Sequence, residues 1–170
     1  YSSAASDVYK RQDFERIADH AVNLVHSSEE LQQKKMELSA PALAELKVLT
    51  NAVSEILSLS LDAFLKDDLQ SAVMVEPLEQ VIDGLKEQLR TNHILRLQKE
   101  QCSIEAGFVW SDMLTDLERV SDHCSNIAGC IMDMHEGKLN LHESLRAMKE
   151  DREKFAERYS LYQEKYALPQ

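Results

Sequence analysis

The chain has 170 residues, of which 44% are apolar, and its formal net charge is −11. This length is enough for one domain with a hydrophobic core, and the apolar content is that of a folded protein rather than a disordered one. An acidic surface without a basic patch repels nucleic acid phosphates, which excludes nucleic acid as a partner. The three cysteines lack CxxC spacing, so they indicate neither a zinc site nor a disulfide framework.

A membrane span needs about 18 or more consecutive apolar residues. The most apolar stretch, "AVSEILSLSLDAFL", is interrupted by Glu55 and Asp62. We therefore expect no direct membrane span in these residues. No secretory signal pattern is present either.

The first twelve residues, "YSSAASDVYKRQ", lack an initiator methionine and a helical apolar stripe. They resemble a translated sequencing-adaptor or cloning remnant. We predict that residues 1–12 are non-native, and we expect the fold to be specified by the rest of the chain.

Only four glycines and three prolines interrupt the chain, which favours long helices. Pro77 lies inside one predicted helix and should kink it or mark its true start near Glu76. No alternating strand pattern is present, so the predicted fold is all-α, an antiparallel bundle of long helices joined by short turns. Five helices are predicted. The first spans residues 13–35, the second starts at its cap Ser39 and ends at 66–68, and the third then runs to about Leu97. The fourth runs from Ile104 to His135 and is stopped by Gly137, and the fifth spans 141–166 and is capped by Asn140.

One short formula recurs in three of these helices: an apolar residue, Glu, any residue, an apolar residue, any residue, and Asp. Four-residue spacing places both carboxylates of a copy on one helix face, about one turn apart. Two close like charges are mildly destabilising unless a cation or a basic side chain offsets them. The three pairs are Glu15 and Asp19, Glu79 and Asp83, and Glu118 and Asp122.

The helical phase places these pairs beside the core, not in it. With Leu117 as zero and about 100° per residue, Glu118 and Asp122 fall about 100° and 140° away. Glu79 and Asp83 fall at the same angles from Leu78. If the third and fourth helices are neighbours, four carboxylates converge on a solvent-reachable patch whose oxygen atoms suit iron, manganese or magnesium. On the pattern alone, an ordinary solvated acidic surface is an equally good interpretation.

Other kinds of site fit less well. A buried di-iron enzyme needs Glu-x-x-His, and none of the six histidines follows a glutamate at that spacing. The "HESLR" stretch has arginine where a zinc protease needs its second histidine. His20 and His123 each follow the Asp of the formula, and we interpret them as hydrogen-bonded boundary residues or as outer partners of a metal site.

The phrases "DFERIADHAVNL" and "DLERVSDHCSNIA" resemble the E(D)xxxD signature of the phosphate-uptake regulator (PhoU) family. The longer run from "AVMVEPLEQVIDGLKEQL" to "SDHCSNIA" resembles more closely the PhoU-like C-terminal domain of bacterial sodium/phosphate cotransporter family proteins. The resemblance covers about residues 13–136. It implies two similar three-helix bundles that bind multinuclear iron or zinc clusters at these motifs.

The resemblance implies four segments in this chain. They are the remnant at 1–12, the last helix of a truncated first bundle at 13–38, a complete three-helix bundle at 39–137, and a helical extension at 138–170. Glu79, Asp83, Glu118 and Asp122 would then be metal ligands of the complete bundle. Glu15 and Asp19 would be half of the other bundle's ligand set.

The implied function is that of a non-enzymatic regulatory domain of a sodium-dependent phosphate transporter, on the cytoplasmic side of the bacterial membrane. Its partner would be a membrane phosphate transporter, in cis as a fused domain or in trans, and the domain could self-associate. A free-standing PhoU-type regulator is the alternative. A carboxylate-bridged metalloenzyme is a third hypothesis, disfavoured by the missing histidine ligands.

Overall fold

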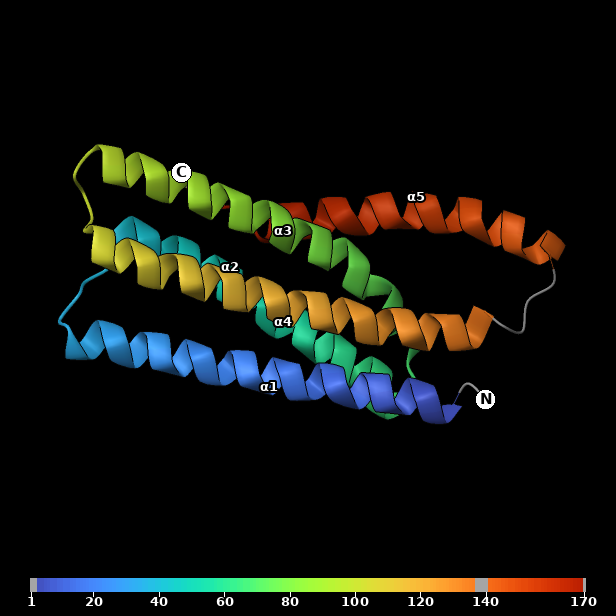
Figure 1. The fold of residues 1–170 in the computed structure, drawn as a ribbon. Coiled ribbons are helices and arrows are strands. Elements are labelled where there is room, and N and C mark those ends of the chain that lie inside the picture. The colour runs from blue at the N-terminus through green and yellow to red at the C-terminus, as the bar shows by residue number, and fades with distance from the viewer. Residues whose placement is uncertain (1–2, 137–140, 170) are drawn as a thin grey trace.

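The computed structural model describes residues 3–136 and 141–169, and the part of the chain that it describes is all helical apart from short connections. The predicted all-α bundle of long helices is therefore confirmed (Figure 1). Gly137 and Asn140, the predicted end and start of two helices, lie outside the described residues. The helices are α1 (Ser3–Gln33), α2 (Ala40–Lys66), α3 (Leu69–Gln98), α4 (Ile104–Glu136) and α5 (Leu141–Lys165).

Helices α2, α3 and α4 pack against one another and enclose the core. The predicted cap at Ser39 is confirmed, since its side chain accepts a hydrogen bond from the Ala42 amide, and Asp68 caps α3 by accepting one from the Gln70 amide. The predicted helical phase also holds, because Leu78, Val81, Leu117 and Val120 are all buried. The sequence thus places its apolar stripe on the correct face of both helices.

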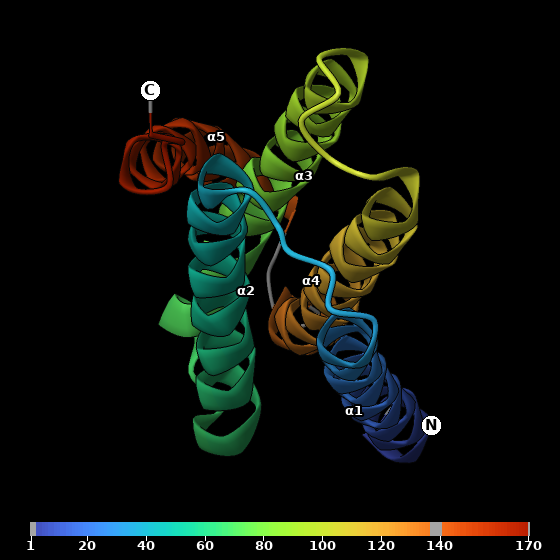
Figure 2. The same cartoon turned by 90° about the vertical axis from the view of Figure 1, so that its left-hand side faces the viewer.

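Helix α1 packs along α4, outside the three-helix bundle (Figures 1 and 2). It begins at Ser3, so the helix continues into the stretch that we expected to stand apart from the fold. Lys10 explains part of this continuation, since its side chain is buried, its amine contacts the Met134 sulfur at 3.7 Å, and it lies 5.5 Å from the centre of the Phe64 ring. That residues 1–12 are non-native stays a prediction.

Helix α3 continues through Pro77 without ending there. Proline has no N–H, so Pro77 cannot donate to the carbonyl of Val73 one turn earlier. Arg158 of α5 donates to that carbonyl at 3.4 Å. Helix α5 therefore packs on α3 where the proline leaves a backbone acceptor without its usual partner.

Among the described residues, α2 is the one helix that is long and apolar enough to cross a membrane by length and composition. Core helices of water-soluble proteins pass the same criterion. In this fold α2 contacts both α3 and α4, and Leu49, Ala52 and Ile56 have no exposed surface. The core therefore accounts for the buried 33% of the most apolar 18 residues of α2, whereas Leu43, Phe64 and Leu65 of the same helix are exposed.

Candidate metal centre

Three carboxylates from two helices converge at the middle of the α3–α4 contact. Glu79 and Asp83 lie one turn apart on α3, and Asp122 lies on α4. Oxygen atoms from the three side chains all lie within 4.8 Å of one another, and each side chain is half-buried. Three of the four carboxylates that were predicted to converge from the third and fourth helices therefore do so. They lie in a partly desolvated position and not on the open surface.

The electrostatics of this cluster are unfavourable in the absence of a cation. Burial, followed by the neighbouring charges of Asp83 and Asp122, raises the pKa of Glu79 to about 7. Burial and the nearby Asp122 and Glu118 carboxylates raise the pKa of Asp83 above its usual value. Burial and Glu118 raise the pKa of Asp122 in the same way. All three shifts have the sign expected when like charges share a poorly solvated site.

One atom of the cluster lacks a partner. The Oδ1 atom of Asp83 is buried and accepts no hydrogen bond from any described residue. Buried carboxylate oxygens normally accept hydrogen bonds or bind a cation, because an unsatisfied one is costly. The cluster therefore has the charge and the free oxygen that a cation needs.

Glu118, the fourth predicted ligand of this bundle, is positioned differently. Its carboxylate accepts a hydrogen bond from the Lys86 ammonium group, and both side chains are largely buried. It is not one of the three converging residues. Lys86 was not among the residues predicted for this site. Its position one turn after Ile82, on the same helix as Asp83, is the signal that could have placed it near the carboxylates.

Glu15 and Asp19, the remaining predicted ligands, do not join the cluster. They lie on the exposed side of α1, and Glu15 forms a surface ion pair with Arg11 at 3.1 Å. They occupy the same places in their copy of the formula as Glu118 and Asp122 do in theirs. Within the described residues, no third helix packs on α1 as α3 packs on α4, so the second pair has no facing carboxylates.

The two copies of the long phrase contact each other across α1 and α4. His123 donates to Asp13 at 2.8 Å, and His20 donates to Asp116 at the same distance. The two imidazole rings stack between these bonds, with centroids 5.7 Å apart. The hydrogen-bonded boundary role predicted for both histidines is thereby confirmed, whereas the aspartates that accept from them, one at the start of each phrase, were not anticipated.

The donor set determines what this site can hold. Three carboxylates supply oxygen ligands, which suit Mg²⁺, Mn²⁺ and iron ions. The imidazole next to Asp122, that of His123, is directed to Asp13 and not to the cluster. The described residues therefore fit one hard cation at Glu79, Asp83 and Asp122, and the three converging residues include no histidine ligand of the kind used by di-iron enzymes.

Comparison with known proteins shows which family the chain is related to. Residues 46–131, just over half of the chain, match the PhoU domain. The chain is also similar to the phosphate-specific transport system accessory protein PhoU homolog 1 of Thermotoga maritima, with 28% identity over 136 residues. The match covers 80% of this chain and 57% of the relative, so the chain spans little more than half of that protein.

No solved structure matches the chain. The matched segment contains most of α2, all of α3 and nearly all of α4, and therefore the whole carboxylate cluster. The sequence match, the repeated acidic formula and the all-helical bundle lead to one identification. The chain belongs to the PhoU family.

Proposed function

We propose that this chain is a regulatory domain of phosphate transport that binds a metal cation through Glu79, Asp83 and Asp122. Family membership and the similarity to the phosphate-specific transport system accessory protein of Thermotoga support the link to phosphate transport. The observation that carries the metal proposal is the convergence of three half-buried carboxylates, one with an oxygen that lacks a partner. In this proposal the domain acts by binding and is not an enzyme.

The site joins α3 to α4, which suggests how a cation would act on the domain. Without a cation, the three carboxylates repel one another across the helix contact, or one of them takes up a proton. With a bound cation, Glu79 and Asp83 on one helix and Asp122 on the other share one positive partner. Loading of the site therefore holds the two helices together, and a membrane phosphate transporter would bind the loaded form.

The oxygen-only ligand set favours iron, manganese or magnesium over zinc, which more often takes cysteine and histidine ligands. Glu118 would become a metal ligand only if its ion pair with Lys86 were broken. A mononuclear centre is the arrangement that the three converging residues support. A multinuclear iron or zinc cluster would need ligands beyond these three.

The domain contacts the transporter in one of two ways. In the first, the domain is fused to a sodium/phosphate cotransporter and lies on the cytoplasmic side of the membrane, as the run from residue 72 to residue 128 suggests. In the second, the domain acts in trans as a free-standing regulator, which the accessory protein of Thermotoga supports. The complete gene separates them, since spanning helices encoded upstream mean fusion and a start codon ahead of one extra helix pair means the free-standing form.

Metal analysis tests the site. The variant Glu79→Gln/Asp83→Asn/Asp122→Asn should lose the metal that copurifies with the wild-type protein. The matched control is Glu15→Gln/Asp19→Asn, which alters the exposed pair on α1 and should keep full metal content. Equal metal content in all three proteins would reduce the cluster to an ordinary acidic surface.

Phosphate uptake tests the function. In a strain without this gene, uptake should no longer fall when external phosphate is raised. The wild-type gene should restore this response, and the triple carboxylate variant should not. Restoration by the triple variant would show that regulation does not need the metal site, and unchanged uptake in the deletion strain would refute the regulatory role.

A further inference from the structure

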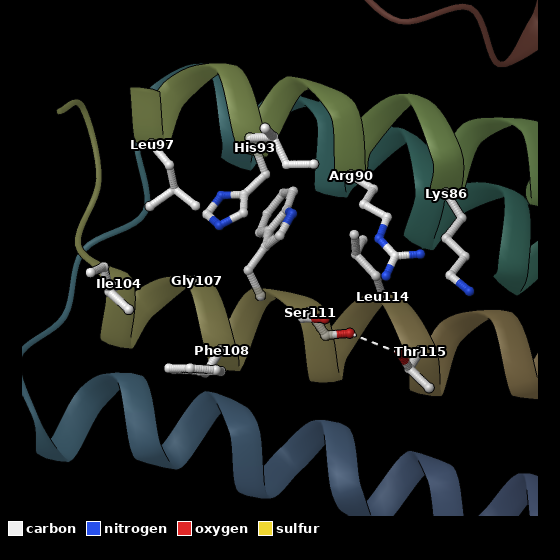
Figure 3. Close-up of a pocket in the computed structure, with 12 residues that line it drawn as sticks. Lys86, Arg90, His93, Leu97, Ile104, Gly107, Phe108, Ser111, Leu114 and Thr115 are labelled. Carbon is white, nitrogen blue, oxygen red and sulfur yellow. Dashed lines mark hydrogen bonds between the residues drawn. The ribbon is translucent and has the colours of Figure 1, made fainter. Parts of the chain in front are cut away.

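A cavity of about 360 Å³ lies between α3 and α4, on the side of the metal centre nearer to the turn that joins these helices. Figures 1 and 2 show the two helices spreading apart toward this turn. Figure 3 shows side chains from both helices facing the space between them. The volume is at the small end of the range found for small-molecule pockets, about 300–1,000 Å³.

Packing around His93 explains why the helices do not close here. The His93 ring lies against α4 at Gly107, where an added Cβ would be only 2.7 Å from Nε2 of the ring. The His93 ring also packs on Trp110, with ring centroids 6.0 Å apart. Beyond these two rings, the α4 side of the cavity is lined by Leu114 and by Ser111 and Thr115, whose small side chains leave space.

The lining is apolar with a positive edge. Leu97, Ile104, Phe108 and Leu114 provide apolar walls, and no aspartate or glutamate is among the described residues that line the cavity. Lys86 and Arg90 reach from α3 toward α4 along one edge (Figure 3). This lining is unusual in a chain with a net charge of −11.

Among the described basic side chains that line the cavity, Arg90 is the one whose N–H donors are available to a ligand. The Lys86 ammonium group is paired with Glu118, and burial together with the nearby Arg96 lowers the pKa of His93, which disfavours the charged form of its ring. Arg90 lies 4.0 Å from Glu87, which is the outer limit of an ion pair, and its side chain is exposed. A guanidinium group offers paired donors for a carboxylate, phosphate or sulfonate group.

We propose that this cavity binds a small amphipathic organic anion, with its apolar body against Trp110, Leu114 and Phe108 and its anionic head on Arg90. The site is separate from the metal centre and does not depend on the proposed role in phosphate transport. Burial of the apolar body supplies most of the affinity, and the Arg90 contact selects for negative charge. Arg90 supplies a local positive charge for the anion in a chain whose net charge is −11.

The probe for this site is anilinonaphthalene sulfonate, an anion with a fused ring system. N-phenylnaphthylamine, which has the same rings without the sulfonate, is the neutral control. Trp110 is the only tryptophan and lines the cavity, so energy transfer from it to the bound probe is strongest for a probe in this cavity, and the variants below assign the binding to it. We expect saturable energy transfer from the folded protein, with the anion binding at least about tenfold more tightly than the neutral analogue.

Two variants separate the charge from the cavity. Arg90→Gln should weaken binding of the anionic probe about tenfold and leave the neutral probe unchanged. Ser111→Phe should fill the cavity and remove both probes. Arg152→Gln, which removes an exposed arginine on α5, should change neither. Circular dichroism melts of each variant confirm folding, because partly unfolded proteins also bind this dye.

The overturning results are equally specific. Equal affinity for the two probes, or an unchanged affinity in Arg90→Gln, would refute the anion site. No effect of Ser111→Phe on the binding of either probe would place the dye elsewhere on the protein and refute the cavity site. Displacement of the dye by octanoate or octyl phosphate would support a soluble anion, whereas displacement only by phosphatidylglycerol vesicles would show a membrane surface contact and overturn the proposal.

Discussion

The carboxylate of Asp13 accepts a hydrogen bond from His123 at 2.8 Å, and this contact joins the start of one repeated phrase to the middle of the other. The reciprocal bond, from His20 to Asp116, has the same length. Asn126 and Asn23 donate to the same two aspartate oxygens at 3.4 Å and 3.2 Å. Each copy therefore supplies the acceptor for the other's histidine and asparagine, so the two phrases form a reciprocal pair across the α1–α4 contact.

This reciprocity predicts how α1 is held. Asp13→Ala/Asp116→Ala removes both acceptors from partly buried histidines, at a cost of about 1 kcal/mol for each hydrogen bond. Since α1 packs on α4 outside the three-helix bundle, we expect α1 to open locally while α2, α3 and α4 stay folded. Hydrogen exchange measured by mass spectrometry should show faster exchange in α1 alone. Faster exchange throughout the chain, or in no segment, would contradict this.

The carboxylate cluster of Glu79, Asp83 and Asp122 predicts a pH dependence of stability in metal-free protein. The pKa of Glu79 rises to about 7 in the folded state from an ordinary value near 4.5, so the folded protein binds more protons than the unfolded chain between these values. Stability should therefore fall as pH rises from about 4.5 to about 7. The raised pKa values of Asp83 and Asp122 act in the same direction.

Thermal melts in the presence of a chelator measure this effect. Glu79→Gln should flatten the decline, and its melting temperature should exceed that of the wild-type protein at pH 8. Added Mn²⁺ should raise the melting temperature of the wild-type protein at that pH and have less effect on Glu79→Gln. A wild-type melting temperature that does not change over this pH range would mean that the carboxylates do not repel one another in the fold.

A buried ion pair near the α3–α4 turn predicts a large effect on stability. Arg96 donates to both oxygens of Glu45 at 3.0 Å, and both side chains are buried. Glu45→Ala leaves the arginine without its partner and should cost about 3–5 kcal/mol of unfolding free energy. Replacing both residues by methionine should recover most of that loss, because buried pairs are often replaceable by apolar residues.

Urea unfolding of the single and double variants provides the measurement. Glu30→Gln is the matched control, since Glu30 pairs with Lys34 on the exposed surface and should change stability by less than about 1 kcal/mol. A Glu45→Ala loss as small as that of the control would show that the buried pair does not stabilise the fold.

The apolar seam of α4 predicts a sharp contrast between neighbouring positions. Val120 is 4% exposed, so Val120→Asp places an unpaired charge in the core and should unfold the bundle at ordinary temperatures. Thr115→Asp adds the same charge at an exposed position of the same helix and should change stability by about 0.5 kcal/mol or less. A melt of Val120→Asp that matches the wild-type protein would show the assigned core face to be wrong.

The sequence by itself determined the helices and the phase of their apolar stripes. Few glycines and prolines and a 3.6-residue period place Leu117 and Val120 in the core, because side-chain direction along a helix follows from spacing alone. The same spacing puts each Glu–Asp pair on one face. The sequence left open whether Pro77 kinks the third helix or starts it; α3 begins at Leu69, so Pro77 does not start it, and Arg158 from another helix donates to the carbonyl that Pro77 cannot reach with an N–H.

Only the tertiary structure decided which carboxylates meet. Spacing within a helix fixes angles about its own axis, but the neighbour and the register of a helix depend on packing between elements. The three copies of the formula therefore have three different environments. Asp122 joins Glu79 and Asp83, Glu118 pairs with Lys86, and the pair on α1 faces outward. The contact between Asp13 and His123 was likewise outside the reach of the sequence, since it needs α1 and α4 to be antiparallel neighbours in one register.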